Sequence, residues 1–412
     1  MTLSADSQAA IAYLRSATAI RERCGMIFAA AEAGETPHFV LHRDRLPDAA
    51  RYVAETIREN YPTLAIPYHS RWRHFAAGGR DRWVRLASGL ADRSREDIAR
   101  IRFDLAVTSV LLDAGAGEAW GYREPASGER LSRSEGLAVA SFDMFVSGAF
   151  SSDSKDPLRA DAAALRHCDE RRLAAGFQVA ADNPLVGLAG RAALLRRLGD
   201  ALGADEELFG ASGRVGNLFD YLFRRAAGRS LPAPEILDAV LRGFSSIWPG
   251  REAIDGVNLG DVWRHSAVRT ADRTTGLVPF HKLSQWLSYS LVEPLEDAGI
   301  AVTGLDRLTG LPEYRNGGLF IDSGVLTPRA PGLLRIRHAV GAEPIVEWRA
   351  LTVILLDRIA DLVRTELGLT AERFPLAKIL EGGTWSAGRR LARERRPGGV
   401  SPVLLDSDGT VF

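Results

Sequence analysis

Apolar residues recur every three or four positions along most of this chain, which is the spacing of an amphipathic helix. In "LTVILLDRIADLVRTEL" the repeat is formed by Leu351, Leu355, Ile359 and Leu362. In "KLSQWLSYSLVEPL" it is formed by Leu283, Leu287, Leu291 and Leu295. The same spacing appears in "PDAARYVAETIRENY", "REDIARIRFDLAVTSVLLDAG", "GRAALLRRLGDALG" and "APEILDAVLRGFSSIW". Several of these segments end at Gly or Pro, as helices do, so we predict a mainly α, compact helical fold.

Strand patterns are few and short. They are confined to "HFVLH", "IAVTGL" and "GLFID", so we expect only a small β element beside the helices. The loop-rich "SGAFSSDSKDP", residues 147–157, is the best candidate boundary. We therefore predict an N-terminal helical region over residues 1–150 and a C-terminal helical region over residues 151–412, unless the chain is one compact unit. The end of the chain, "RRLARERRPGGVSPVLLDSDGTVF", fits a flexible tail or a strap over a neighbouring surface.

Composition narrows the class of protein. The 412 residues are 46% hydrophobic, enough for a sizeable core. Lys plus Arg and Asp plus Glu both total 52, and this balance argues against binding of long nucleic acid but leaves room for a local basic pocket. Two cysteines, Cys24 and Cys168, cannot build a disulfide framework, and no long apolar run or basic leader marks a membrane span or a secreted protein. We expect a cytoplasmic protein that does not bind membranes.

Common cofactor motifs are missing from the sequence. There is no Walker-type loop, and "GASGRVGNLF" lacks the dinucleotide spacing after a clear strand. None of the eight histidines lies in a zinc-binding spacing. We therefore expect neither a metal nor an organic cofactor.

Cations and aromatic residues crowd the segment "YPTLAIPYHSRWRHFAAGGRDRW". His69, Arg71 and Arg73 would lie on a loop between Pro67 and a Gly pair, and guanidinium groups suit phosphate or carboxylate. We therefore name His69, Arg71 and Arg73 as candidate ligands of a small anion. The alternative is that the arginines pair with acidic side chains while the neighbouring aromatic residues enter the core.

Two other helices carry polar residues beside an apolar stripe. In the first, one edge of the helix presents an ammonium, an amide and two aromatic rings, from Lys282, Gln285, Trp286 and Tyr289. These groups suit a polar ligand with an apolar side. In the second, Glu347 begins the long apolar helix, where it is either a buried acid beside a ligand or a partner of the helix dipole. Snorkelling of Lys282 and packing of the aromatic rings is the structural alternative for the first helix.

The segment "RLTGLPEYRNGGLFIDSGVL" contains two carboxylates around a turn pattern. Asn316-Gly317-Gly318 predicts a chain reversal, which would bring Glu313 and Asp322 towards one another. Two acids in a shared site can hold different protonation states, one steadying a cation or activating water and the other donating a proton. A surface hairpin with two solvated acids is the alternative that the pattern alone favours.

Five segments together resemble the uncharacterised-domain family that contains uracil-catabolism protein four. They are "YPTLAIPYHSRWRHF", "LAVTSVLLDAGAG", "KLSQWLSYSLVEPL", "LTGLPEYRNGGLFIDSGVL" and "EWRALTVILLD". This resemblance covers nearly the whole chain. It implies a role in a uracil-degradation route in which the pyrimidine ring of a nucleotide is opened and ribosylurea or its phosphate appears before urea is released.

A second similarity, to the queuosine-salvage nucleotide glycosidases, bears on mechanism. It rests on three segments: Lys282 with Gln285; Leu308, Thr309, Glu313, Tyr314 and Arg315; and Glu347, Arg349 and Ala350. The similarity implies an α-helical fold related to DNA glycosylases and hydrolysis of an N-glycosidic bond. The chain departs from that pattern in two places: Glu313 replaces an aspartate, and Asn316-Gly317-Gly318 replaces an expected proline.

The resulting hypothesis is an N-glycosidase that cleaves ribosylurea or its 5′-phosphate. Asp322 and Glu313 would be the catalytic carboxylates, with the residues named above and Arg315 binding the substrate. Association with other uracil-catabolism enzymes would fit this role. The alternatives are hydrolysis at an amide carbon of another ring-opened intermediate, and a non-catalytic binding subunit.

Overall fold

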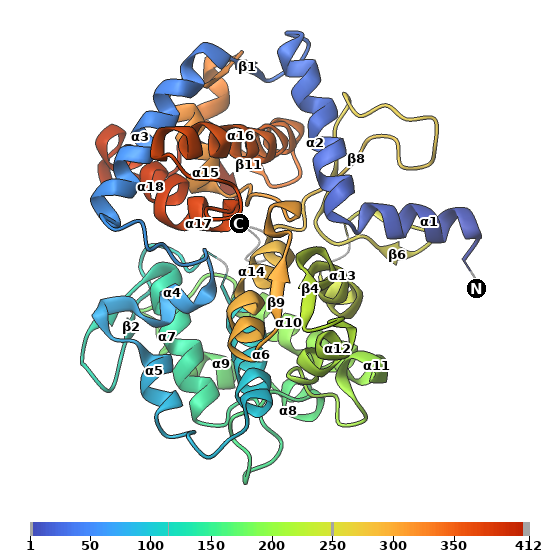
Figure 1. Cartoon of the computed structure of the whole chain (residues 1–412), viewed down its shortest axis with the longest axis vertical. Helices are drawn as coiled ribbons and strands as arrows, with labels where there is room; N and C mark the ends of the chain where they lie inside the picture. Colours follow the sequence, from blue (N-terminus) through green and yellow to red (C-terminus); the bar gives the residue numbers. More distant parts are fainter. Residues whose placement is uncertain (1–2, 114, 249–250, 407–412) are drawn as a thin grey trace. The chain divides into compact units, whose positions relative to one another are not determined.

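The predicted helices form where the sequence places its apolar stripes. The computed structural model describes residues 3–113, 115–248 and 251–406, and most of the ordered elements are helices (Figure 1). The apolar stripe of α16 (Glu343–Leu367) is buried at Leu351, Leu355 and Ile359, and all four leucines of the predicted stripe in α14 (Lys282–Asp297) are buried. The prediction of a mainly α fold with a few short strands is therefore confirmed.

The chain divides into two compact units, and each gathers segments that are distant in sequence. Among the described residues, unit 1 contains 3–69, 251–285 and 304–406, and unit 2 contains 70–113, 115–248 and 286–303. Helix α14 begins in unit 1 and ends in unit 2. The boundary predicted near residue 150 falls inside unit 2, and it stays a prediction.

Unit 1 is built around α16. This helix packs against α2, α3 and α15, and α15 packs closely on α18. The helices of unit 1 are α1 (Ala5–Leu14), α2 (Ala17–Glu32), α3 (Leu46–Asn60), α15 (Tyr314–Asp322), α16, α17 (Leu376–Ile379) and α18 (Trp385–Arg395), with a π-helical segment at Leu380–Thr384. Its strands are β1 (Phe39–Leu41), β5 (Ala253–Ile254), β6 (Val257–Asn258), β7 (Val262–Arg264), β8 (Leu277–Pro279), β10 (Leu326–Pro328), β11 (Arg337–Ala339) and β12 (Leu404–Asp406).

The strands of unit 1 pair only two by two. β1 with β10, β5 with β6, and β7 with β8 are antiparallel, whereas β11 and β12 are parallel. The predicted "HFVLH" strand is thus confirmed as β1. The predicted tail is described as far as β12, and its residues 407–412 lie outside the described residues.

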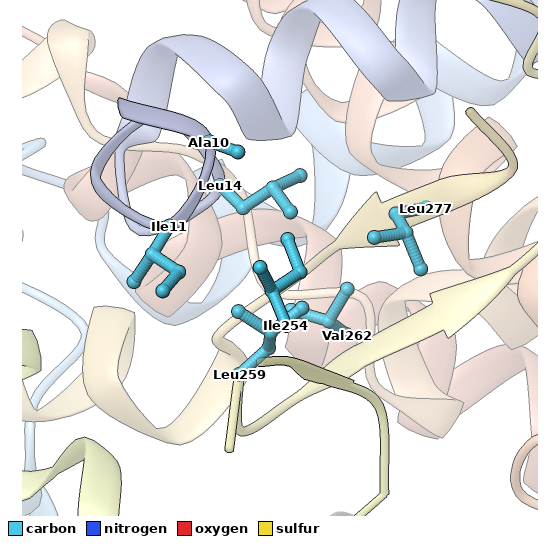
Figure 2. Packing of buried hydrophobic residues seen from close by; sticks show 7 residues of the cluster. All are labelled: Ala10, Ile11, Leu14, Ile254, Leu259, Val262 and Leu277. Carbon is cyan, nitrogen blue, oxygen red and sulfur yellow. The ribbon is translucent and has the colours of Figure 1, made fainter. Parts of the chain in front are cut away.

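A small apolar cluster attaches the first helix to the β5–β8 segment. Figure 2 shows its members: Ala10, Ile11, Leu14, Ile254, Leu259, Val262 and Leu277. The His281 ring adds a polar tie, because its Nε2 lies 2.9 Å from the Leu14 carbonyl oxygen at the end of α1. This packing holds the β7–β8 hairpin, which leads directly into α14.

Unit 2 is also mainly helical. Its helices are α4 (Arg71–Phe75), α5 (Arg82–Ala87), α6 (Arg95–Leu111), α7 (Arg133–Val146), α8 (Ala162–Arg166), α9 (Glu170–Gly176), α10 (Leu188–Ala204), α11 (Glu206–Phe209), α12 (Asn217–Arg225) and α13 (Ala233–Phe244). Its strands are β2 (Tyr122–Arg123), β3 (Arg130–Leu131), β4 (Ser230–Pro232) and β9 (Ala301–Thr303). β2 and β3 are antiparallel, and β4 and β9 are parallel, so the predicted "IAVTGL" strand is confirmed as β9.

Two local predictions are wrong. The "HSRWRHF" segment is not an open loop, since Arg71–Phe75 forms helix α4 with Trp72 and Phe75 buried, as the packing alternative anticipates. The "GLFID" segment is not a strand but the second half of helix α15. Within the described part of the chain, none of the helices combines the length and apolar character needed to cross a membrane.

Candidate active site

An ion pair in unit 1 fixes the start of α14. Asp261 lies just before β7 and accepts hydrogen bonds from both terminal nitrogens of Arg349, each at 2.8 Å. It also accepts from the backbone N–H of Lys282 at 3.0 Å and from the Trp263 indole at 2.6 Å. Burial alone would raise the pKa of Asp261, but the Arg349 charge and these donors bring the pKa below its ordinary value. Asp261 therefore ties the first turn of α14 to α16.

The first turn of α14 presents two of the predicted ligand-binding residues. Gln285 is fully buried, and its Oε1 accepts from the backbone N–H of Thr309 at 3.3 Å. Its Nε2 has no hydrogen-bond partner among the described residues. A buried amide donor without a partner costs free energy, so this nitrogen is a place where a ligand acceptor would bind favourably. Lys282 lies one turn earlier, and its charge acts on Glu313.

Glu313 caps the N-terminus of α15. Its two carboxylate oxygens accept from the backbone N–H groups of Arg315 at 2.8 Å and Asn316 at 2.6 Å. Burial raises the pKa of Glu313 above its ordinary value, although these two hydrogen bonds and the Lys282 charge act in the opposite direction. Glu313 is therefore a buried carboxyl group whose proton is held more tightly than that of a solvated glutamate.

The predicted turn at residues 316–318 is wrong, because these residues form the first turns of α15. The two glycines allow close packing of a helix rather than a chain reversal. A Cβ atom on Gly317 would lie 2.7 Å from the ring of Trp348, whose indole donates to the Gly317 carbonyl at 3.0 Å. On Gly318 a Cβ atom would lie 3.2 Å from Pro402. The Asn-Gly-Gly pattern thus brings α15 against its neighbours.

Asp322 lies at the other end of the same helix. It is separated from Glu313 by nine residues, which is about 13 Å of helical rise at 1.5 Å per residue. Asp322 accepts from both terminal nitrogens of Arg396, at 2.6 and 2.5 Å. Each of the two predicted catalytic carboxylates therefore has its own partners, and their joint catalytic role stays a prediction.

Glu347 is a buried carboxylate surrounded by protein donors. It accepts from the backbone N–H groups of His38 at 3.2 Å and Phe39 at 2.7 Å, and it lies 3.1 Å from the Nε2 atom of His265. The Nδ1 atom of His265 accepts from the backbone N–H of Ala267, so the His265 proton is on Nε2 and is donated to Glu347. These contacts connect α16 to β1 and to the end of β7.

The other two predicted residues of unit 1 are also held by the protein. Arg315 donates to the Gly399 carbonyl at 2.7 Å. The His69 Nδ1 atom lies 2.7 Å from Glu381, which belongs to the π-helical segment. Segments of this kind occur often at functional sites, and this one also places Trp385 beside the His69 ring, with 6.2 Å between ring centroids.

Four predicted ligand-binding residues belong to unit 2. Arg71 is fully buried; it donates to Ser109 at 2.7 Å and to Asp113 at 2.8 Å. Arg73 pairs with Glu293 at 2.6 Å. Both arginines thus have acidic partners within unit 2, as the alternative interpretation of this segment expects.

The other two predicted ligand-binding residues of unit 2 are the aromatic residues Trp286 and Tyr289 of α14, and both pack within this unit. Tyr289 is fully buried, and Trp286 is 6% exposed. The His74 ring meets Trp286 edge-on at a centroid distance of 5.6 Å, and the Arg71 guanidinium lies 5.6 Å from the same ring. These contacts give the two side chains a packing role in addition to any contact with a ligand.

Sequence patterns did not point to Asp261 or Glu381. Asp261 sits in "VNLGDVW", which matches no catalytic spacing, and its partner Arg349 is 88 residues away. Glu381 is 312 residues from His69. Only the Arg349 position in the "EWRA" segment hinted at a polar contact in this region.

The fold and the site define a mainly helical protein with a cluster of polar residues, which we call the polar cluster. Its buried members are Gln285, Glu313 and Arg349, and its partly exposed members are Asp261 and Lys282. Residues 13–412 match the family described as "Protein of unknown function (DUF1688)", and the chain belongs to this family. The resemblance stated from the sequence motifs is thereby confirmed.

Two relatives match over nearly the full chain. One is "Protein urg3" of Schizosaccharomyces pombe, which is 38% identical over 410 residues, covering 98% of this chain and 99% of that protein. The other is "Uracil catabolism protein 4" of Lachancea kluyveri, also 38% identical, over 440 residues and the same shares of the two chains. Similarity of this extent indicates that the same fold spans all three proteins.

Proposed function

We propose that this protein acts in uracil catabolism and hydrolyses the N-glycosidic bond of ribosylurea or its 5′-phosphate. The products are urea and the pentose or its phosphate. The pathway part of the proposal is supported by the relative named "Uracil catabolism protein 4", which is 38% identical over 98% of this chain. The reaction itself is supported by the polar cluster of unit 1.

The observation that carries the reaction is the state of Glu313. Burial raises the pKa of this carboxyl group, which makes it a better proton donor near neutral pH than a solvated glutamate. The neighbouring positive charge of Lys282 acts on Glu313, and the buried amide nitrogen of Gln285 adds a hydrogen-bond donor for a substrate oxygen. One carboxylic acid with donors beside it is the minimum needed to assist departure of a poor nitrogen leaving group.

The bond changes are simple. Glu313 donates its proton to the urea nitrogen as the bond between that nitrogen and the anomeric carbon breaks, and the bonding electron pair leaves with urea. Water adds to the anomeric carbon, and its proton returns to the Glu313 carboxylate. The reaction consumes one water and needs no redox cofactor.

We further propose that unit 1 is related in fold to the DNA-glycosylase-like queuosine-salvage glycosidases. The three motif segments that carry the similarity are distant in sequence, yet they are linked within unit 1. Gln285 accepts from Thr309, while Lys282 and Arg349 share Asp261 as an acceptor. This linkage is what a common site built from the three motifs requires.

The proposed reaction belongs in the cytoplasm, in association with other uracil-catabolism enzymes and without long nucleic acid. Cys24 and Cys168 are both buried thiols, which supports a reducing compartment. The neutral formal charge of the chain agrees with a small-molecule substrate rather than with a nucleic acid.

The test is to incubate the purified protein with synthetic ribosylurea and with its 5′-phosphate and to measure urea and free pentose. We expect both products from at least one substrate, with kcat falling as pH rises through the raised pKa of Glu313. Glu313→Gln should lower kcat by about 100-fold or more, because the amide oxygen keeps only one of the two capping hydrogen bonds and the amide cannot donate the proton as a carboxylic acid does.

Asp322→Asn is the matched comparison, since it makes the same carboxylate-to-amide change at the other end of α15. The motif-based prediction expects this variant to lose turnover, whereas the Arg396 ion pair favours a structural effect. Loss of activity in Asp322→Asn with full activity in Glu313→Gln would refute Glu313 as the acid. Release of urea without free pentose, or binding without turnover, would refute the N-glycosidase itself.

A further inference from the structure

Arg315 is a buried arginine of unit 1 that has no acidic partner. It is 5% exposed, and no carboxylate of the described residues forms an ion pair with it. Within the described part of the chain its side chain makes one hydrogen bond, from Nη1 to the Gly399 carbonyl at 2.7 Å, and its buried Nε atom has no partner. A guanidinium carries five N–H donors and a charge that is costly to bury alone. The surroundings of Arg315 are therefore short of acceptors, and an anion would complete them best.

Three other arginines of the basic segment and of the site differ from Arg315 in this respect. Each has a carboxylate partner: Arg71 with Asp113, Arg73 with Glu293, and Arg349 with Asp261. An anionic group of a ligand would have to compete with a protein carboxylate at each of these positions. It would meet no such competitor at Arg315.

Arg315 lies directly beside the proposed proton donor. Its backbone N–H donates to the Glu313 carboxylate at 2.8 Å, and its positive charge acts on Glu313. An arginine side chain is of similar length to the span between the anomeric carbon and the phosphorus atom of a pentose 5-phosphate. A substrate whose anomeric carbon lies at Glu313 therefore has its phosphate within reach of the Arg315 guanidinium.

The protein holds Arg315 in place before any ligand binds. The Gly399 carbonyl fixes one guanidinium nitrogen, and the guanidinium carbon lies 4.7 Å from the centroid of the Tyr314 ring. Helix α18 packs against the backbone, since a Cβ atom added at Gly388 would overlap the Arg315 carbonyl oxygen. An ordered side chain loses less conformational entropy when a ligand binds.

Phosphate is the anion that fits this position. Urea and the sugar hydroxyls are neutral, so the 5′-phosphate is the part of the proposed substrate that carries negative charge. Guanidinium groups bind phosphate through paired, charge-assisted N–H donors. We propose that Arg315 binds the 5′-phosphate of the substrate and thereby selects ribosylurea 5′-phosphate over ribosylurea. This inference rests on the proposed function, because it takes Glu313 as the residue beside the anomeric carbon.

Binding at equilibrium tests the inference without turnover. Ribose 5-phosphate and ribose are titrated separately into the full-length protein by calorimetry. We expect saturable binding of ribose 5-phosphate and at least about tenfold weaker binding of ribose. Arg315→Gln should weaken binding of ribose 5-phosphate by about tenfold or more, as expected for loss of a charge-assisted contact. Arg315→Lys should have an intermediate affinity, because an ammonium keeps the charge but loses the paired donors.

Arg396→Ala is the matched control. Arg396 belongs to the same C-terminal segment as Gly399 and holds it to α15 through the ion pair with Asp322. The variant removes one positive charge and loosens this segment, but it leaves the Arg315 guanidinium in the protein. Its affinity for ribose 5-phosphate should differ from that of the wild type by less than about twofold.

Kinetics provide a readout that a purely structural role of Arg315 would not produce. Ribosylurea and its 5′-phosphate are compared as substrates of the wild type and of Arg315→Gln. The variant should raise KM for the phosphorylated substrate by about tenfold or more with little change in kcat, and should leave both constants for ribosylurea unchanged. Equal losses on both substrates would show that Arg315 supports the fold instead.

Two binding results would also overturn the inference: the absence of saturable binding of ribose 5-phosphate, and equal weakening by Arg396→Ala and Arg315→Gln. Failure of the proposed function is a different outcome. If neither substrate released urea, while binding of ribose 5-phosphate still depended on Arg315, the hydrolysis would be refuted and the phosphate contact would stand. Circular dichroism shows whether each variant is folded, and Arg315→Lys replaces Arg315→Gln if the latter is not.

Discussion

The two adjacent glycines of α15 provide a sharp test of why this helix lies where it does. Alanine at 317 would bring a methyl group to 2.7 Å from the ring carbons of Trp348, a side chain that is 1% exposed. Overpacking of this kind costs about 1–3 kcal/mol, and displacing the indole also endangers its hydrogen bond to the Gly317 carbonyl, worth about 1 kcal/mol. The higher helix propensity of alanine returns about 1 kcal/mol.

The net expectation for Gly317→Ala is a loss of about 2 kcal/mol in the free energy of unfolding. In a cooperative unit of about 200 residues this lowers Tm by about 4–8 °C. Gly318→Ala is the matched control, because its methyl group would meet only Pro402, at 3.2 Å. We expect the control to be neutral or up to about 1 kcal/mol more stable.

The assay is thermal and urea denaturation of both variants, followed by circular dichroism and by tryptophan fluorescence. The near-ultraviolet signal should also change in Gly317→Ala, since Trp348 must shift. Equal stability of the two variants would show that the close approach of α15 to Trp348 is not the reason why residue 317 is a glycine. The same conclusion would follow if Gly317→Ala were the more stable of the two.

Three further predictions concern buried charges. Arg396→Ala should lower the free energy of unfolding by about 1–3 kcal/mol in urea denaturation, because the Asp322 carboxylate loses its partner. Adding Asp322→Asn to this variant should restore part of the loss. If the double variant restored none of it, the ion-pair explanation would be contradicted. Glu347→Gln should cost about 1–3 kcal/mol, since the amide nitrogen that replaces one carboxylate oxygen is a donor and cannot accept a hydrogen bond, and an unchanged Tm would contradict this. Burial raises the pKa of Asp104 to about 6, against the effect of Arg214, so the folded protein binds this proton more tightly than the unfolded chain. The stability that this proton contributes is fully present below the pKa of Asp104 in the unfolded chain, and it is lost as pH rises through about 6. The urea midpoint of Asp104→Asn should therefore fall less than that of the wild type between about pH 4 and pH 7. Parallel plots of midpoint against pH for the two proteins would refute the raised pKa of Asp104.

Much of the helical framework follows from local sequence patterns. The stripes in α14 and α16 are long, and their apolar residues are buried as the spacing requires. The "GLFID" segment was wrongly predicted as a strand, because the alternation of Leu319 and Ile321 after two glycines is typical of a strand that follows a turn. The decisive contacts are a carboxylate cap from Glu313 and the packing against Trp348, and the second comes from a residue 31 positions away.

The candidate site was accessible from the sequence only in part. Lys282, Gln285 and Glu313 lie in motifs with recognisable similarity, and the structure links these motifs within unit 1. Asp261 could not be found in this way, because a single aspartate after a glycine has no distinctive spacing. Its importance comes from Arg349, and no local pattern encodes a contact across 88 residues.

The interrupted composition of unit 1 has a consequence for how the protein is made. Helices α2 and α3 leave the ribosome before the rest of unit 1, but they pack against α16, which is synthesised almost 300 residues later. The N-terminal helices must therefore wait with their apolar faces uncovered while unit 2 is translated. At about 5–20 residues per second this delay is on the order of tens of seconds. During that time the exposed apolar faces of α2 and α3 would be binding sites for chaperones.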